Sequence, residues 1–111
     1  MNKVILMGRL TRDPDIRYST GESATAVARY TLAVDRRFRR DGEQTADFIG
    51  CVAWRKTAEF VSKYFKKGSM IIVEGTLQNN NYTDSNGVKH YSYNVVADSV
   101  SFGESKSASN P

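Results

Sequence analysis

The chain has 111 residues, the size of one domain, and its 40% apolar, 11% aromatic and 25% charged residues are typical of a globular protein rather than a disordered one. Sixteen Lys and Arg against twelve Asp and Glu give a formal charge of +4, which favours a polyanionic partner. A single cysteine excludes an internal disulfide, and no apolar stretch is long enough to cross a bilayer or to act as a secretion signal, so we expect a cytoplasmic protein.

The first half of the chain carries three candidate strands. Residues 2–10 are mostly apolar and end at a turn cluster over residues 11–15. Residues 24–34 alternate between apolar and polar side chains, which is the pattern of a strand that is buried on one face. A charged loop at 35–43 separates this strand from a third candidate at 46–54.

The hydrophobic period changes to that of a helix at residues 57–67, where the large apolar side chains recur at helical spacing. Thr57 is the expected N-cap of this helix. Lys66 and Lys67 are expected in its last turn, and Gly68 is expected to end it in a left-handed conformation.

The rest of the chain predicts two further strands, at 70–78 and at about 89–102. In the first of them Leu77 is expected to share one face with Ile71 and Val73. Between the two strands, the pair Asn86-Gly87 is a strong hairpin-turn signal. Five aromatic side chains are expected to serve packing: Tyr18, Tyr64, Phe65, Tyr91 and Phe102.

Three strands, one short helix and two strands is the element order of the OB-fold, a small Greek-key barrel. Other five-stranded arrangements remain open from the pattern alone. We therefore predict an all-β fold with one short helix, a five-stranded OB-fold barrel in which the helix lies between strands three and four. The barrel is expected to be one domain over residues 1–103, followed by a short polar tail over residues 104–111.

The sequence gives no positive sign of an enzyme. His90 is the only histidine and lies in an alternating strand, where a surface or cross-strand role is the common one. Cys51 is the only cysteine and fits a small core hydrophobe better than a reactive thiol. Asp13 and Asp15 flank a proline, and a turn explains them as well as a cation site does. We expect no catalysis, no metal and no cofactor.

A binder of single-stranded nucleic acid needs cations for the phosphates and flat aromatic surfaces for unpaired bases. The loop residues 36–40 read Arg-Arg-Phe-Arg-Arg, which surrounds Phe38 with four guanidinium groups. An exposed Phe at a loop tip lowers solubility, and stacking on a base would explain why it is there. Tyr82 has only polar neighbours in sequence and is expected to be exposed at a hairpin.

The third strand carries apolar side chains on both faces. Phe48 and Trp54 are six residues apart, which places them on one face, while Ile49, Cys51 and Ala53 occupy the other. Only one face of a strand in a small barrel lines the core, so the other must contact a ligand or a subunit. The pattern alone leaves open which face does which.

In these features the chain resembles the bacterial or phage-type single-stranded DNA-binding proteins. The blocks that carry the resemblance occur in order at the family's spacing over residues 1–102, and they are weak singly and specific together. They are Asn2–Leu10, Asp13–Tyr18, Tyr30–Val34, Trp54–Glu59, Lys67–Ser69, Val73–Gly75, Tyr82–Asp84 and Gly87.

The resemblance implies an OB-fold barrel, assembled as a homo-oligomer and usually a tetramer, around which single strands wrap. Its stacking aromatics correspond to Phe38, Phe48, Trp54 and Tyr82. The family often has tryptophan at three of these positions, so the smaller rings here are expected to stack less strongly.

The resemblance also implies phosphate-contacting bases and a subunit interface. Lys3, Lys56 and Lys67 fall on positions where the family places bases, and the charge of the neighbouring segments adds Arg37, Arg39 and Arg55. Ile49 aligns with a subunit-interface position, and we expect Val4 and Leu6 to join it. This assigns the Phe48 and Trp54 face to DNA.

The resemblance predicts a non-catalytic, sequence-tolerant protein that binds and protects single-stranded DNA in replication, recombination, repair or DNA uptake. The alternative is an OB-fold module that binds RNA or helps to load a primosome. The last nine residues lack the acidic tip with which typical family members recruit replication and repair enzymes, so recruitment by that route is not expected.

Overall fold

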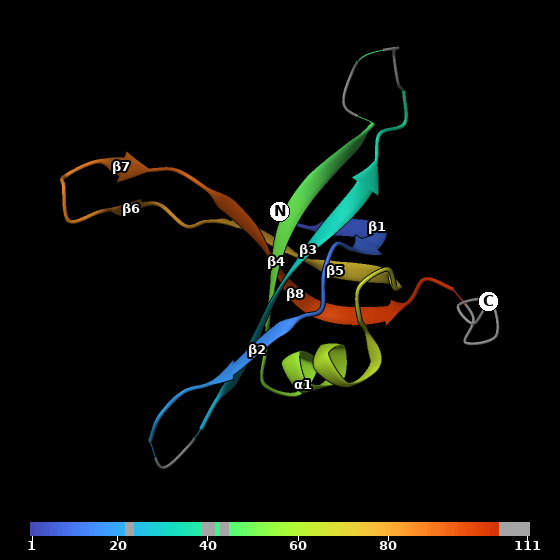
Figure 1. The fold of residues 1–111 in the computed structure, drawn as a ribbon, viewed down its shortest axis with the longest axis horizontal. Coiled ribbons are helices and arrows are strands. Elements are labelled where there is room, and N and C mark those ends of the chain that lie inside the picture. Colours follow the sequence, from blue (N-terminus) through green and yellow to red (C-terminus); the bar gives the residue numbers. More distant parts are fainter. Residues whose placement is uncertain (22–23, 39–41, 43–44, 105–111) are drawn as a thin grey trace.

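The structure is a computed structural model that describes residues 1–21, 24–38, 42 and 45–104. Within that part of the chain, five long or medium strands wrap into a barrel with one helix below it, and hairpins extend outward from it (Figure 1). The elements are β1 (Val4–Leu10), β2 (Asp15–Tyr18), β3 (Ala26–Asp35), β4 (Ala46–Trp54), α1 (Arg55–Tyr64), β5 (Met70–Asn79), β6 (Tyr82–Thr83), β7 (Lys89–His90) and β8 (Tyr93–Phe102).

The strand β1 closes the barrel because it pairs on both of its edges. It runs antiparallel to β5 from Val4 to Arg9, and its last two residues also pair with β3. The strand order β1-β5-β8-β4-β3 then returns to β1, with β4 and β8 parallel and β2 added on the outer edge of β3. The OB-fold prediction is therefore confirmed, with the helix between the third and fourth barrel strands.

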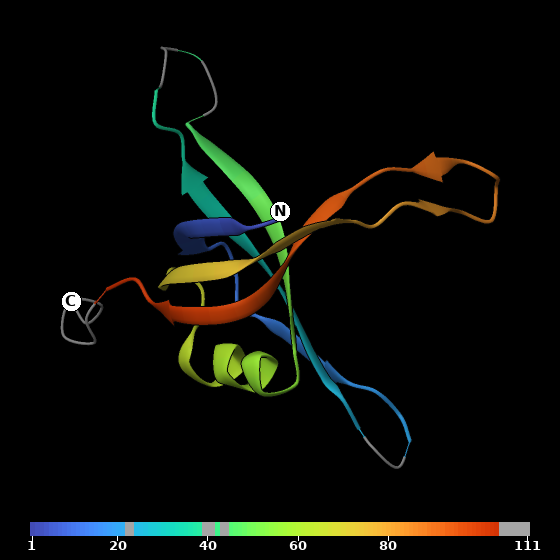
Figure 2. The same cartoon turned by 180° about the vertical axis from the view of Figure 1, so that it is seen from behind.

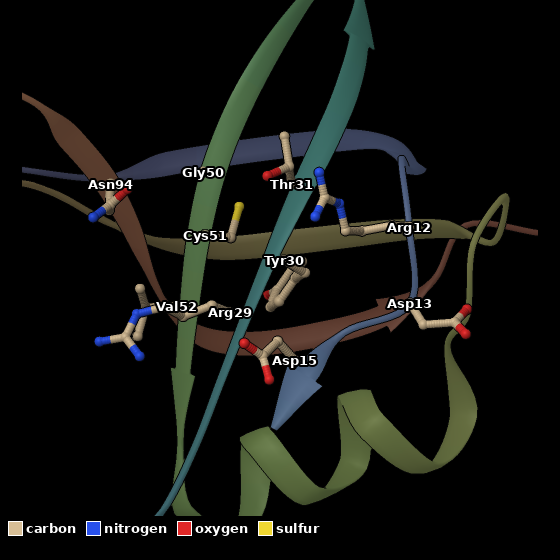
Figure 3. A pocket seen from close by; sticks show the side chains of 10 residues that line it. All are labelled: Arg12, Asp13, Asp15, Arg29, Tyr30, Thr31, Gly50, Cys51, Val52 and Asn94. Carbon is tan, nitrogen blue, oxygen red and sulfur yellow. The ribbon is translucent and has the colours of Figure 1, made fainter. Parts of the chain in front are cut away.

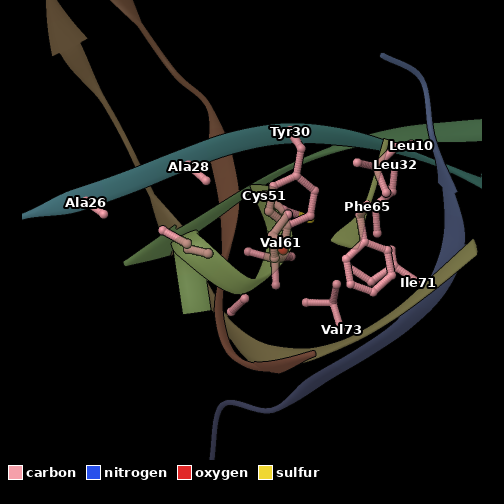
Figure 4. Close-up of a cluster of buried hydrophobic side chains, with 14 residues drawn as sticks. Leu10, Ala26, Ala28, Tyr30, Leu32, Cys51, Val61, Phe65, Ile71 and Val73 are labelled. Atoms are coloured by element: carbon pink, nitrogen blue, oxygen red, sulfur yellow. The ribbon is translucent and has the colours of Figure 1, made fainter. Parts of the chain in front are cut away.

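The core fills the barrel and the gap between the barrel and α1 (Figure 4). The inward faces of the strands supply residues such as Leu32, Ile71 and Val73, which are fully buried. From α1 and the residue after it come Val61 and Phe65. Because side chains alternate along each strand, every inward position leaves its neighbour outside.

The helix differs from the sequence expectation at both ends. It begins at Arg55, directly after β4, and Trp54 rather than Thr57 is the N-cap, without a side-chain hydrogen bond. It ends at Tyr64, so Lys63 and not Lys66 or Lys67 lies in its last turn. With ten residues, the helix is too short to cross a lipid bilayer, and no other helix occurs in the described ranges.

The tight connection between β4 and α1 explains the early start. Arg55 has φ +56°, a left-handed conformation that turns the chain sharply out of the strand. Gly68 also has a positive φ, +88°, as expected, but it lies four residues beyond the end of the helix. Its backbone N–H donates to the carbonyl of Leu10 at 2.8 Å, which ties this turn to the barrel.

Two short strands were not anticipated, β2 and β6, and the strand predicted at about 89–102 is divided into β7 and β8. The strand β2 pairs with β3 just after the predicted turn cluster. The strands β6 and β7 form a hairpin within the connection between β5 and β8, which we call the β6–β7 arm, residues 80–92 (Figure 2). Its turn lies at the predicted place, with Gly87 at φ +80°. Leu77 lies near the base of this arm and is exposed, whereas Ile71 and Val73, with which it was expected to share a face, are buried.

The packing prediction for five aromatic residues is right in part. Phe65 is buried, and Tyr64 and Phe102 are half-exposed rings that contact it or Phe60 in an aromatic cluster beside α1. Tyr18 and Tyr91 are exposed, because β2 and the β6–β7 arm extend away from the core.

The end of the described chain still contacts the barrel. The N–H of Gly103 donates to the carbonyl of Met70 at 3.0 Å, and Glu104 lies 3.5 Å from Arg9. The division into a domain over residues 1–103 and a tail over residues 104–111 stays a prediction, since residues 105–111 lie outside the described part.

We expect Gly75→Ala to destabilise the barrel and Gly50→Ala to leave it almost unchanged. A Cβ atom at Gly75 would collide with the backbone of Val96 at an irregularity in the β5–β8 pairing, whereas one at Gly50 would meet only the movable side-chain oxygen of Asn94. We expect Gly75→Ala to lower the free energy of unfolding by about 2 kcal/mol and Tm by about 8 °C. Thermal unfolding followed by circular dichroism measures this, and equal Tm values for the two variants would contradict it.

Candidate nucleic-acid interface

The outer face of β4 presents two aromatic rings to solvent. Phe48 is 64% exposed and Trp54 is 49% exposed, while Cys51 and Ala53 on the inner face are buried in the core. Leaving a large apolar side chain in water forgoes up to about 1.5–3 kcal/mol of burial free energy. The pattern alone did not show which face of this strand lines the core. In the structure the Cys51 and Ala53 face does, and the face with Phe48 and Trp54, the two rings assigned to base stacking, is in contact with solvent.

A hollow of about 370 Å³ lies against this part of β3 and β4 (Figure 3). Gly50 and Val52 line it from β4. They lie on the same face of the strand as Phe48 and Trp54, between these two rings. Asn94 lines it from β8, close to Gly50. A side chain at residue 50 would project towards Asn94, so glycine keeps this part of the hollow open.

The hollow has arginines that the sequence analysis did not assign. Arg12 and Arg29 line it together with Asp13 and Asp15, so its formal charge is balanced. Both aspartates, however, have cationic or N–H partners elsewhere. Asp13 accepts the backbone N–H of Lys67 at 2.8 Å, and Asp15 pairs with the arginine two residues further along β2 at 3.4 Å. Arg12 and Arg29 are thus candidates for phosphate contacts beside the exposed rings.

The alternation of β3 contained a signal for one of these arginines. Arg29 lies on the polar face of β3, opposite Val52 in the β3–β4 register. Arg12 joins it because the chain still follows β3 where β1 ends. There the N–H of Thr11 donates to the carbonyl of Thr31 at 3.0 Å, a contact of which the turn cluster gave no sign in the sequence.

The loop between β3 and β4 carries the third ring. Phe38 is 83% exposed, and the guanidinium carbon of Arg37 lies 5.8 Å from the centre of the ring, which is cation–π geometry. At the base of the loop, Arg36 binds Asp47 at 2.9 Å, and this hydrogen bond raises the pKa of the guanidinium above its usual value. Arg39 lies outside the described residues.

The fourth ring, Tyr82, lies on the β6–β7 arm and is 56% exposed. It stacks on His90 across the hairpin, with ring centres 4.7 Å apart and an angle of 12° between the planes. The predicted stacking residues therefore lie on three separate parts of the fold: the β3–β4 loop, the outer face of β4 and the β6–β7 arm.

The remaining predicted phosphate ligands differ in their surroundings. Arg55 and Lys56 are exposed at the start of α1, directly after Trp54. Lys67 is exposed in the turn that follows the helix. Lys3 pairs with Glu74, with Nζ 3.3 Å from the carboxylate, so a phosphate at Lys3 would compete with that carboxylate.

The three predicted interface residues are partly buried. Val4, Leu6 and Ile49 pack against the core cluster, and a role between subunits stays a prediction for them. The large apolar side chains that β1 leaves in water are Ile5 and Met7, on its other face. A second copy of the chain would therefore find more apolar surface at Ile5 and Met7 than at Val4 and Leu6.

The described residues hold little that could perform covalent chemistry. Burial raises the pKa of Cys51 to about 12, so its thiol stays protonated at neutral pH and is a poor nucleophile. Its buried position agrees with the prediction that Cys51 is a small apolar residue of the core. Within the described ranges, no group of three or more His, Cys, Asp or Glu side chains could hold a metal ion.

Comparison with known proteins agrees with this geometry. The model of the single-strand binding protein family matches residues 1–103. A single-stranded DNA-binding protein of Fusobacterium nucleatum is 51% identical over 98% of this chain and 71% of its own length. Single-stranded DNA-binding protein 2 of Listeria monocytogenes is 52% identical over 96% of this chain and 66% of its own length. The single-stranded DNA-binding protein of Bacillus cereus is 53% identical over 92% of this chain and 59% of its own length. The match thus spans 59–71% of the length of these three relatives.

We expect Trp54→Ala to weaken binding of oligo-dT by about 1–3 kcal/mol, because one stacked base loses its ring. Trp54 is an outer-face residue, so circular dichroism should show an intact barrel. Tyr64→Ala is the matched control, since Tyr64 is equally exposed but lies on α1. Fluorescence anisotropy of a labelled oligo-dT measures both affinities. An unchanged affinity of folded Trp54→Ala, or an equal loss in Tyr64→Ala, would remove Trp54 from the interface.

Proposed function

The chain belongs to the single-strand binding protein family, and from this premise we propose that it binds and protects single-stranded DNA with little sequence preference. Proteins of this family bind DNA without catalysing a reaction. The proposal extends to the processes that expose single strands, namely replication, recombination, repair and DNA uptake. A cytoplasmic location, where such strands occur in bacteria, stays a prediction.

The observation that carries the proposal is the pair of exposed rings, Phe48 and Trp54, on either side of a hollow lined by arginines. Unpaired bases stack on aromatic side chains with about 1–3 kcal/mol each, whatever the base, because every base has a π-face. Arginines beside the rings displace counterions from the phosphates and add affinity that does not depend on sequence. Stacked bases cannot pair, so binding would also remove hairpins from the strand.

The distribution of the rings supports a strand that bends around the protein. Phe38 and Tyr82 lie on extensions that leave the barrel in different directions, with β4 between them (Figures 1 and 2). A single strand that contacts all of these rings must follow the surface of the barrel.

We further propose that the protein acts as a homo-oligomer, and as a tetramer in particular. The support is the exposed apolar face of β1, where Ile5 is 63% and Met7 is 54% exposed on a chain of only 111 residues. We expect light scattering to give a mass four times that of the chain, and we expect the double variant Ile5→Glu/Met7→Glu to give a smaller one, since buried like charges destabilise an apolar contact. A wild-type monomer, or an unchanged mass of the variant, would contradict the proposal.

We expect the affinity for oligo-dT to fall with salt, by about 0.7 log units per log unit of salt for each phosphate neutralised. Trp54 is the only tryptophan, so its fluorescence quenching reports one stacking site as salt is varied. Arg29→Ala should reduce the slope by about 0.7, whereas Lys63→Ala on α1 should leave it unchanged.

Two outcomes would contradict this proposal. No quenching with a folded protein would mean that no base stacks on Trp54. Displacement of the DNA by an equal amount of RNA of matched length would favour the RNA-binding alternative.

A further inference from the structure

The β6–β7 arm is too small to be stable through strand pairing alone. It has two residues in each strand, with Tyr82 opposite His90 and Thr83 opposite Lys89. A two-stranded hairpin is marginal in water even when it is longer. Something other than the ladder must therefore hold Tyr82 in one orientation.

The carboxylate of Asp84 organises the arm. Its Oδ1 accepts the backbone N–H groups of Asn86 at 2.9 Å and Val88 at 3.0 Å, which closes the turn. Its Oδ2 lies 2.9 Å from Nε2 of His90. These hydrogen bonds lower the pKa of Asp84, and the one with His90 contributes most. The group is therefore an ionised carboxylate at neutral pH. An ionised carboxylate only accepts hydrogen bonds, so Nε2 of His90 carries the proton that bridges them.

The anchored imidazole lies against one face of the Tyr82 ring. The ring centres are 4.7 Å apart and the planes are within 12° of parallel, so the two rings are stacked. Tyr82 nonetheless keeps 56% of its surface exposed. One face of the phenol ring is therefore supported, and the other is available to a base.

Support of this kind matters because ordering a free side chain costs free energy on binding. A tyrosine on an isolated hairpin must lose its side-chain rotations when a base stacks on it. A tyrosine that already rests on a fixed imidazole has lost them before the base arrives.

We propose that His90 is a positioning residue of the single-strand interface: it holds the Tyr82 ring from behind, so that a base, Tyr82 and His90 form one continuous stack. Asp84 fixes the imidazole and closes the turn. The proposal rests on the proposed role of Tyr82 in base stacking. It adds a residue that acts through Tyr82 and does not itself touch the DNA.

The test is a double-mutant cycle on oligo-dT affinity. Tyr82→Ala should weaken binding by about 5- to 100-fold, the loss of one stacked base. His90→Ala should weaken it by about 2- to 5-fold in the wild-type background and not at all in the Tyr82→Ala background, since its effect passes through Tyr82. Tyr91→Ala, an exposed ring next to His90, is the control, and its effect should be the same in both backgrounds.

Two further variants separate stacking from simple anchoring of the arm. His90→Phe keeps a flat ring but cannot donate to Asp84, whereas His90→Gln keeps an N–H donor but has no ring. We expect His90→Phe, whose ring can still stack but is not held by Asp84, to bind more tightly than His90→Ala though less tightly than the wild type, and His90→Gln to behave like His90→Ala. Photocrosslinking of 5-iodouracil oligonucleotides, with the yield at Tyr82 measured by mass spectrometry, should follow the same order.

The outcomes separate the inference from its premise. Rescue by His90→Gln, failure of rescue by His90→Phe, or an equal loss from His90→Ala with and without Tyr82 would overturn the role of His90. An unaffected Tyr82→Ala variant would instead remove Tyr82 from the interface, while binding through Trp54 would still test the proposed function.

Discussion

The alternation of side chains along β4 connects the stability of this protein to the surface that we propose for binding. One face of the strand must fill a small barrel, and Cys51 and Ala53 do so completely. The alternate positions of the strand then have to face outward, and these include Phe48 and Trp54. Since the barrel is closed by the pairing of β1 with both β5 and β3, no second layer within the described chain covers this outer face. The rings stay exposed because the topology gives them no place inside.

Closure of the barrel has a second consequence. A rigid scaffold holds the rings of β4 in place, but it cannot hold side chains on the hairpins that leave it. Phe38 and Tyr82 therefore depend on local interactions. At the β3–β4 loop these are the Arg36–Asp47 pair and the guanidinium of Arg37 beside the ring. On the β6–β7 arm, Asp84 and His90 replace the packing that the barrel would otherwise provide.

The sequence predicted the barrel strands well because a strand with one buried face carries a period of two, and the helix because its period differs. It predicted the ends of the helix poorly. Thr57 is a good N-cap in isolation, but the chain turns directly out of β4 at Arg55, and the tertiary connection decides the start. The strand β2 was missed because its pairing partner lies in β3 and a turn cluster precedes it.

The candidate interface, too, could be predicted from the sequence only in part. Exposed rings could be found in the sequence, because an aromatic residue among polar neighbours, or on the second apolar face of a strand, is visible there. Arg12 could not be found, because only the pairing of the end of β1 with β3 brings it into the lining of the same hollow as Gly50. The contact of His90 with Tyr82 depends on the register of a hairpin with two residues per strand, which the turn signal places only approximately.

The placement of the rings also bears on the choice between single and double strands. In a duplex, the faces of the bases are covered by their neighbours, so Trp54 and Tyr82 would have nothing to stack on. A duplex is also stiff, with a persistence length of about 150 base pairs, whereas the whole molecule measures 41 × 35 × 29 Å. Rings on the β3–β4 loop, on β4 and on the β6–β7 arm can be reached together only by a chain that bends within that distance. The stacking sites that we propose would therefore favour single strands through their arrangement, without any contact that reads base identity.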